Sequence, residues 1–199
     1  MAFERLVVAS TNRGKLREIG QILAPLGVEV LPQSAFDVPE AEEPYDTFVE
    51  NALAKARHAA QRTGLPALAD DSGICVDALG GAPGVHSARF AGEPRSDERN
   101  NAKLLEMLAG QTNRAAHYYC VIVVMRHGAD PQPLIAQGLW YGEILTAPRG
   151  SGGFGYDPLF LDIESGQTGA ELAPVRKNLM SHRGKALALL VQALTRRPA

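Results

Sequence analysis

The chain has 199 residues, 45% of them hydrophobic and 21% charged, with a formal net charge of −2. This composition is ordinary for a soluble globular protein, and the small negative charge argues against a nucleic-acid-binding module or an anionic membrane surface as partner. No run of about 18 apolar residues occurs and the N-terminal segment carries both acid and base, so we expect neither a membrane span nor a signal peptide, and a cytoplasmic location. Cys75 and Cys120 lack metal-ligand spacing and are expected to be buried free thiols.

Apolar spacing and the Gly and Pro signals predict the elements in chain order. The first half contains a strand (5–10), a helix ended by Pro25 and Gly27, a strand (28–31), an acidic loop (32–46), a helix (47–63) and two strands (65–69 and 74–79). The second half contains an irregular loop (84–95), a helix (97–109), two antiparallel neighbouring strands (116–126 and 134–145), a glycine-rich turn (150–158), a weak helix (171–178) and a final helix (181–196). Because the middle strands arrive in pairs, we expect an α/β fold with a long, mixed, twisted sheet and flanking helices, as one domain over residues 1–199.

A polar turn follows the first strand and opens the first helix. Its residues are Ser10, Thr11, Asn12, Arg13, Gly14 and Lys15. Free backbone N–H groups at a helix start, with a lysine beside them, form a pocket for phosphate. The turn lacks the second upstream glycine of the common phosphate-binding loop, and the alternative is an ordinary strand-to-helix turn with a solvated lysine.

Two acidic groups indicate metal or proton chemistry. Asp70 and Asp71 come where a strand is expected to end, and alternation along the strand predicts that one faces a ligand while the other points away. One of Glu40, Glu42 and Glu43 in the acidic loop would share Mg²⁺ with Asp71, because Mg²⁺ takes one or two carboxylates together with phosphate oxygens. The alternatives are a capped acidic turn and a solvated loop.

Aromatic and basic residues in the last third of the chain favour contact with a nucleobase. Phe154 and Tyr156 lie among glycines, which leaves ring faces available for stacking. Lys177, His182 and Arg183 supply hydrogen-bond donors that suit an oxygen on a base. The alternatives are a tight turn with its rings in the core and a solvated basic patch.

Taken together, six segments resemble the inosine/xanthosine triphosphate pyrophosphatase family over nearly the whole chain: STNRGK, FVENALAKA, LADDSG, GGAPGVHSARF, GGFGYDP and SHRGKAL. The resemblance implies two lobes around a nucleotide cleft, a homodimer, a Mg²⁺ requirement, and hydrolysis between the α and β phosphates of non-standard purine nucleoside triphosphates such as ITP, dITP and XTP. It argues against a Maf-like pyrophosphatase for pyrimidine nucleotides, which would share the architecture but not GGFGYDP and SHRGKAL. A nucleotide-binding regulator without turnover is the second alternative.

The resemblance also implies roles for single residues. Asp71 would accept a proton and bind the metal, with Glu43 as the second metal ligand and Glu42 as its rival. The nucleotide would be contacted by Ser10, Thr11, Asn12, Arg13, Gly14, Lys15, Lys55, Ser72, Phe154, Gly155, Tyr156, Asp157, Lys177, His182 and Arg183.

Overall fold

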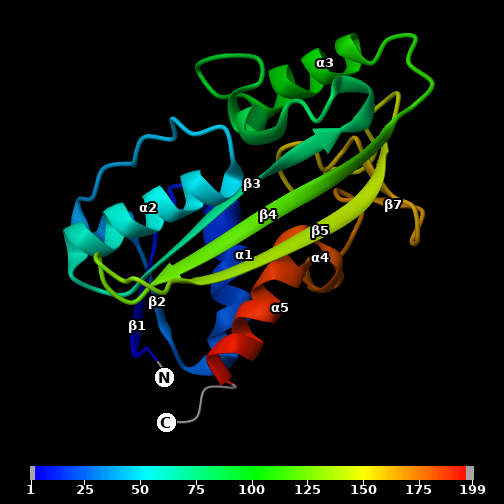
Figure 1. The fold of residues 1–199 in the computed structure, drawn as a ribbon. Coiled ribbons are helices and arrows are strands. Elements are labelled where there is room, and N and C mark those ends of the chain that lie inside the picture. Colours follow the sequence, from blue (N-terminus) through cyan, green and yellow to red (C-terminus); the bar gives the residue numbers. More distant parts are fainter. Residues whose placement is uncertain (1–2, 196–199) are drawn as a thin grey trace. The chain divides into compact units, whose positions relative to one another are not determined.

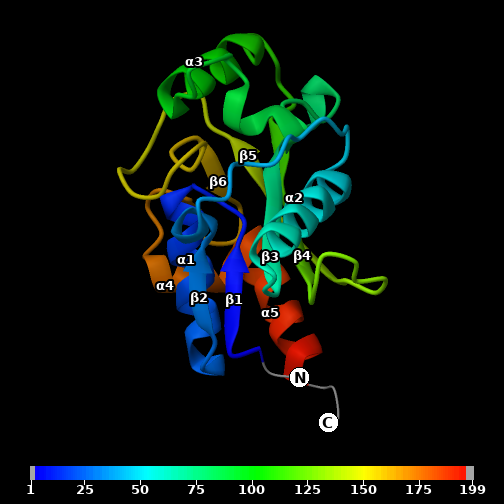
Figure 2. The same ribbon diagram turned by 90° about the vertical axis from the view of Figure 1, so that its left-hand side faces the viewer.

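The computed structural model describes residues 3–195 (Figures 1 and 2), and the chain divides into two compact units. Unit 1 contains the described residues 3–71, 120–138 and 183–195. Unit 2 contains Ser72–Tyr119 and Leu139–His182. Each unit has its own hydrophobic cluster, so the two are described in turn.

Seven strands form one sheet in the order β2-β1-β3-β4-β5-β6-β7. β1 pairs in parallel with β2 and β3, whereas β6 pairs antiparallel with β5 and β7, which confirms the expected mixed sheet. The N–H of Ile144 donates to the carbonyl of Arg114 at 2.9 Å, so the end of β5 lies beside the start of β4, as expected for antiparallel neighbours. The strands are β1 (Arg5–Val8), β2 (Glu29–Pro32), β3 (Ala67–Val76), β4 (Ala115–Met125), β5 (Leu134–Ile144), β6 (Phe160–Asp162) and β7 (Gln167–Thr168).

In unit 1, helices cover both faces of the sheet (Figure 2). Helices α1 (Arg13–Leu23) and α5 (His182–Thr195) lie on one face, where Ile19 and Leu187 share a buried cluster with Leu68 of β3. Helix α2 (Phe48–Thr63) packs near β1, and apart from Asn51 its buried side chains are alanines, at positions 52, 56, 59 and 60. A helix lined with alanine can approach a sheet closely, which brings its longer polar side chains near the strands.

The helix starts and ends follow from their capping residues. The side chain of Asn12 accepts from the N–H groups of Gly14 and Lys15 and so caps α1. The hydroxyl of Thr47 accepts from the N–H of Glu50 at 3.4 Å, and Gly64, at φ +67°, ends α2 in the left-handed conformation that glycine favours. Both ends of α2 agree with the sequence prediction.

Unit 2 is organised around a second cluster that includes Trp140, Phe160 and Leu104. Its helices are α3 (Asp97–Met107) and α4 (Pro174–Met180), and residues Gly84–Arg89 form a short 3₁₀ segment where an irregular loop was expected. The segment 150–158 contains neither helix nor strand, as predicted. Strands β6 and β7 were not predicted, because runs of three and two residues are too short to show a period.

The prediction of two strands separated by Asp70 to Gly73 is wrong. A single strand, β3, runs from Ala67 to Val76 through all four of these residues. Asp, Ser and Gly favour turns when only the local sequence is considered, but here the two carboxylates have cationic partners that permit their burial within a strand. Asp70 and Asp71 therefore lie in the middle of β3.

Candidate active site

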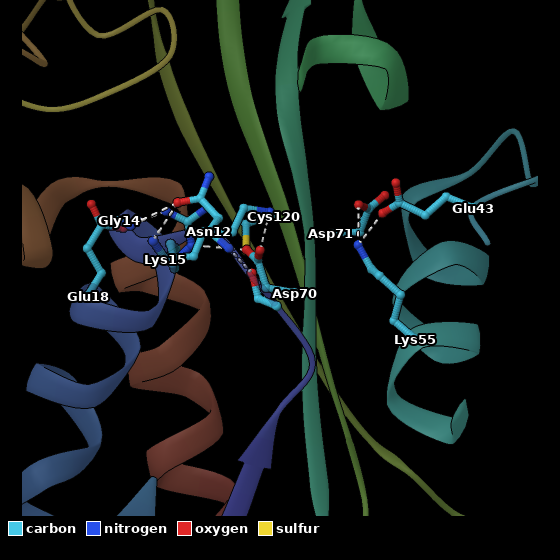
Figure 3. Close-up of polar contacts among 11 residues, drawn as sticks. Asn12, Gly14, Lys15, Glu18, Glu43, Lys55, Asp70, Asp71 and Cys120 are labelled. Atoms are coloured by element: carbon cyan, nitrogen blue, oxygen red, sulfur yellow. Dashed lines mark hydrogen bonds and ion pairs between the residues drawn. The ribbon is translucent and has the colours of Figure 1, made fainter. Parts of the chain in front are cut away.

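The strand-to-helix turn of unit 1 is held by its own polar side chains. Asn12 Oδ1 accepts from the N–H of Gly14 at 2.9 Å and from that of Lys15 at 3.1 Å, and Ser10 Oγ accepts from the N–H of Asn12 at 3.1 Å. The hydroxyl of Thr11 donates to Glu40 in the acidic loop. These contacts fix the backbone of the turn, and with it the position from which the Lys15 side chain extends in the first turn of α1 (Figure 3).

Asp70 is the centre of a buried ion-pair network on the face of β3 that α1 and α5 cover. Its carboxylate pairs with the ammonium of Lys15, and Arg183 Nε donates to Asp70 Oδ2 at 3.0 Å. Arg183 is only 2% exposed, and its Nη1 pairs with Glu18 at 2.5 Å. Cys120 Sγ lies 3.1 Å from Asp70 Oδ2.

Asp71 belongs to a separate cluster on the opposite face of β3, beside α2 (Figure 3). Lys55 Nζ lies 2.8 Å from Asp71 Oδ1 and 2.6 Å from Glu43 Oε1, so one ammonium joins the two carboxylates. This geometry favours Glu43 over Glu42, whose side chain is exposed. The other Asp71 oxygen, Oδ2, is buried and has no hydrogen-bond partner among the described residues.

The two neighbouring aspartates have pKa values shifted in opposite directions. Burial alone raises the pKa of Asp70, but the charges of Arg183 and Lys15 outweigh it and hold that pKa well below the ordinary value. Burial also raises the pKa of Asp71, and there the nearby cations Lys55 and Lys15 do not compensate for it fully. A buried carboxyl with a raised pKa is a better proton acceptor than an ordinary aspartate, and such groups are frequent at active sites.

Lys55 keeps its charge in spite of its burial. Desolvation lowers the pKa of its ammonium, but the carboxylates of Asp71 and Glu43 more than offset it and leave the pKa raised. The charge between the carboxylates of Asp71 and Glu43 is thus supplied by the Lys55 ammonium. Two carboxylates with one uncommitted oxygen suit Mg²⁺, which completes its shell with waters and phosphate oxygens. Among residues 3–195 no group of three or more His, Cys, Asp or Glu side chains is placed to hold a metal.

In unit 2, the predicted nucleobase residues meet around the glycine-rich segment. Asp157 Oδ2 accepts from the N–H of Phe154 at 2.8 Å and from Lys177 Nζ at 2.6 Å. That ammonium also lies 4.8 Å from the centre of the Phe154 ring. The Tyr156 hydroxyl donates to the carbonyl of Ser87 at 2.8 Å, so this ring is part of the core.

The remaining predicted contacts differ in how available they are. His182 is buried and stacks on Tyr118, with ring centres 4.6 Å apart. Ser72 is half-buried on β3 and Arg13 is exposed at the start of α1. The Nε and Nη1 groups of Arg183 are committed to carboxylates, so a contact between Arg183 and a base stays a prediction.

The sequence analysis missed several partners of these residues. Glu18 lies within α1 and Cys120 within β4, and nothing in the sequence around either residue indicates a contact with Arg183 or Asp70. Asp97 and Asn101 of α3 bond to the backbone of Gly155, a contact across more than 50 residues of chain. Strand alternation is the one local signal that was available, and it correctly predicted opposite faces for Asp70 and Asp71.

Comparison with known proteins decides the family. The model of the Ham1 family matches residues 6–193. The chain belongs to the Ham1 family. Two relatives with the name dITP/XTP pyrophosphatase, from Nitrosomonas europaea and Aromatoleum aromaticum, are 66% and 64% identical to it, covering 96% and 98% of this chain and 94% and 98% of their own.

Solved structures of Ham1 proteins share the fold. A HAM1 protein from Coxiella burnetii is 50% identical with a TM-score of 0.90, and covers 97% of this chain and 99% of its own. The Staphylococcus aureus Ham1 protein is 39% identical with a TM-score of 0.86, over 96% and 98%. Within the described part of this Ham1-family chain, no helix is long and apolar enough to cross a membrane.

Proposed function

We propose that this chain hydrolyses non-standard purine nucleoside triphosphates (ITP, dITP and XTP) to the nucleoside monophosphate and pyrophosphate. The observation that carries the proposal is the pairing of Asp71 and Glu43 through Lys55, together with a buried Asp71 oxygen that makes no hydrogen bond to any of residues 3–195. The relatives from Nitrosomonas europaea and Aromatoleum aromaticum, with dITP/XTP pyrophosphatase as their name, supply the substrate class.

Asp71 and Glu43 are the proposed metal ligands. Bound there, Mg²⁺ would neutralise phosphate oxygens and lower the pKa of a coordinated water. Lys55 Nζ bonds to both carboxylates, so its ammonium would have to give up one or both of these contacts if both acids were to bind the metal. The four-carbon stem of lysine permits such a movement without any change in the backbone of α2.

The reaction is a displacement at the α-phosphorus. A water oxygen forms the new bond to phosphorus, the bond to the bridging oxygen breaks, and pyrophosphate leaves with that oxygen. Asp71 Oδ2 is the proton acceptor in this proposal, since this buried oxygen makes no hydrogen bond to the described residues. Phosphoryl transfer depends mainly on positioning and charge, which Lys15, Lys55 and the amide groups at the start of α1 supply.

The segment around Phe154 in unit 2 is the proposed nucleobase contact. The Phe154 ring offers a face for stacking, and the Lys177 ammonium lies close to that ring. His182 stacks on Tyr118, which belongs to the hydrophobic cluster of unit 2. Inosine and xanthosine carry an oxygen at position 6 where adenosine carries an amino group, so a donor aimed at this position favours the first two. A mismatch that leaves a buried polar group unpaired costs about 1–3 kcal/mol, which would lower kcat/KM for ATP by about 5- to 160-fold.

A substrate panel tests the proposal. ITP, dITP, XTP, ATP, GTP, dTTP and UTP are assayed for pyrophosphate release with Mg²⁺ and with a chelator. We expect release from the first three in preference to ATP, dTTP and UTP, and only with the metal. GTP carries the same 6-oxygen, so its rate measures how much of the selectivity depends on position 2 of the base. A preference for dTTP and UTP would indicate the Maf-like alternative, and nucleotide binding without release would indicate a regulator.

Homodimer formation belongs to the same proposal. Light scattering on the purified chain checks it by mass, since one chain is 21.3 kDa. A mass of one chain at micromolar concentration would contradict it.

A further inference from the structure

Helix α3 holds both backbone groups of Gly155. Asp97 Oδ2 accepts from the Gly155 N–H at 2.6 Å, and Asn101 Nδ2 donates to the Gly155 carbonyl at 2.9 Å. The two side chains are four residues apart, so they share one face of α3. Asn101 also donates to the carbonyl of Asp97 at 2.9 Å, which joins the two contacts. We call this pair the α3 clamp.

The α3 clamp is not required to begin the helix. Ser96 already caps α3, because its hydroxyl accepts from the N–H of Arg99 at 3.2 Å. The Asp97 carboxylate is instead directed at a residue 58 positions further along the chain. A charge-assisted bond of this length is among the stronger hydrogen bonds in proteins. The α3 clamp therefore stabilises the backbone of the glycine-rich segment more than it stabilises α3 itself.

The glycine-rich segment is also fixed on the other side of Phe154. The Phe154 N–H donates to Asp157, which in turn is bonded to Lys177. Phe154 thus lies between two held amide groups, its own and that of Gly155. With the backbone fixed on both sides, the direction of the Phe154 Cα–Cβ bond is set, and the centre of the ring lies 4.8 Å from the Lys177 ammonium.

We propose that Asp97 and Asn101 are positioning residues for nucleobase binding, which act through Gly155 on the Phe154 ring. This rests on the proposed function, in which Phe154 contacts the base. Binding of the triphosphate moiety is assigned to unit 1 residues and does not depend on the clamp. Loss of the clamp should therefore weaken nucleotide binding and leave the chemical step unchanged.

Kinetics of clamp variants test the proposal. In Asp97→Ala and Asn101→Ala we expect KM for ITP to rise about tenfold, the effect of one lost hydrogen bond of this strength, with kcat within about threefold of wild type. Inhibition by inorganic tripolyphosphate, which has no base, should be unchanged. Asp97→Asn keeps an acceptor for the Gly155 N–H and should restore KM.

Glu98→Ala is the matched control. It removes one negative charge from the same first turn of α3, and the Glu98 side chain is exposed. We expect its KM to equal that of wild type. An equal rise in KM in Glu98→Ala, an unchanged KM in Asp97→Ala, or a parallel rise in the tripolyphosphate inhibition constant would overturn the proposal.

Hydrogen exchange of the Gly155 amide, followed by NMR, examines the clamp without any turnover. The amide should be protected in wild type and in Glu98→Ala and should exchange faster in Asp97→Ala. Fast exchange in wild type would overturn the clamp itself. Protection of this amide in a wild-type chain that fails to hydrolyse ITP would instead refute the proposed function, and with it the role in base binding, while the clamp as a contact would stand.

Discussion

Asp70 and Asp71 are adjacent in one strand, yet their carboxylates lie on opposite faces of the sheet and their pKa values move in opposite directions. Asp70 faces α1 and α5, where two cations stabilise its charge. Asp71 faces α2, where it shares one ammonium with Glu43. One carboxylate is therefore suited to hold the fold together, and its neighbour is suited to accept a proton.

Asp71→Asn should lose most turnover while it keeps the fold and nucleotide binding. Asparagine has nearly the same shape but cannot take a proton, and a positioned base is worth about 10²–10⁴-fold. Pyrophosphate release and calorimetric binding of ITP measure the two properties separately. A wild-type kcat in this variant would remove Asp71 from the mechanism.

Lys55→Met should make the chain more dependent on Mg²⁺ for its stability. Without the ammonium, Glu43 and Asp71 face each other with no cation between them. We expect the Tm to fall without metal and Mg²⁺ to raise it by several degrees more than in wild type, since saturation at about 100 Kd adds about 2.7 kcal/mol. The double variant with Glu43→Gln is the control and should lose the extra shift. Equal Mg²⁺ shifts in wild type and Lys55→Met would contradict the assignment of these two ligands.

Arg183→Met should destabilise the chain strongly. It leaves the buried carboxylate of Asp70 and the half-buried one of Glu18 short of a cation, and breaking a buried pair costs about 3–5 kcal/mol. Urea unfolding measures the loss. Arg5→Met is the control, because Arg5 pairs with Glu29 at the surface, where such pairs contribute about 0–1 kcal/mol. Losses of equal size in the two variants would be the contrary result.

The same Arg183 variant tests whether this arginine also recognises the base. The ratio of kcat/KM for ITP to that for ATP does not depend on the folded fraction, because this fraction cancels. If Arg183 donates to the 6-oxygen of the base, the ratio should fall about tenfold. A ratio equal to that of wild type would restrict Arg183 to the ion-pair network around Asp70.

The two aspartates should give the stability of the metal-free chain opposite dependences on pH. The lowered pKa of Asp70 stabilises the fold above its ordinary pKa near 3.8, and this contribution is lost as pH falls toward the lower, folded value. The raised pKa of Asp71 has the opposite effect on stability. Its ionisation destabilises the fold above the folded pKa, and this destabilisation vanishes as pH falls below the ordinary pKa. At neutral pH, Asp70→Asn should thus destabilise and Asp71→Asn should stabilise. Urea unfolding in EDTA across acidic and neutral pH measures both, and a loss of stability in Asp71→Asn at neutral pH would be inconsistent with its raised pKa.

Gly153→Ala should disturb the segment around Phe154. Gly153 has φ +73°, and a Cβ there would overlap the carboxylate of Asp157, which holds the Phe154 N–H. We expect KM for ITP to rise about tenfold or more with kcat little changed. Gly110→Ala is the control, because its φ of +76° imposes similar strain while nothing lies within 4 Å of the new methyl group. A KM for Gly153→Ala no higher than that of the control would show that contact with Asp157 is not the cause.

The elements with strong local signals were predictable from the sequence. Asn12 marks the start of α1, Thr47 and Gly64 mark the ends of α2, and alternation places Asp70 and Asp71 on opposite faces. The mixed sheet also followed, because the strands predicted at 116–126 and 134–145 are too close in the chain for a helical crossover, although the other predicted pair, 65–69 and 74–79, is one strand. These features depend on residues close together in the chain.

The partners of the site residues were not predictable, because they come from distant segments. Asp70 and Arg183 are 113 positions apart, and Gly155 meets Asp97 and Asn101 from another element. The same reason explains the wrong turn at Asp70 to Gly73. Local preference favours a turn there, and only the cations brought in by the fold make a buried strand with two carboxylates stable.

The alternation along β3 also limits how this segment can change in evolution. Inserting or deleting one residue just before Asp70 would rotate every following side chain of the strand to the other face. The carboxylate that meets Arg183 and the one that meets Lys55 would then exchange surroundings. A substitution in β3 changes one side chain at a time, whereas a change in the length of β3 would displace the carboxylates of Asp70 and Asp71 together. We therefore expect natural length variation to be confined to the loops.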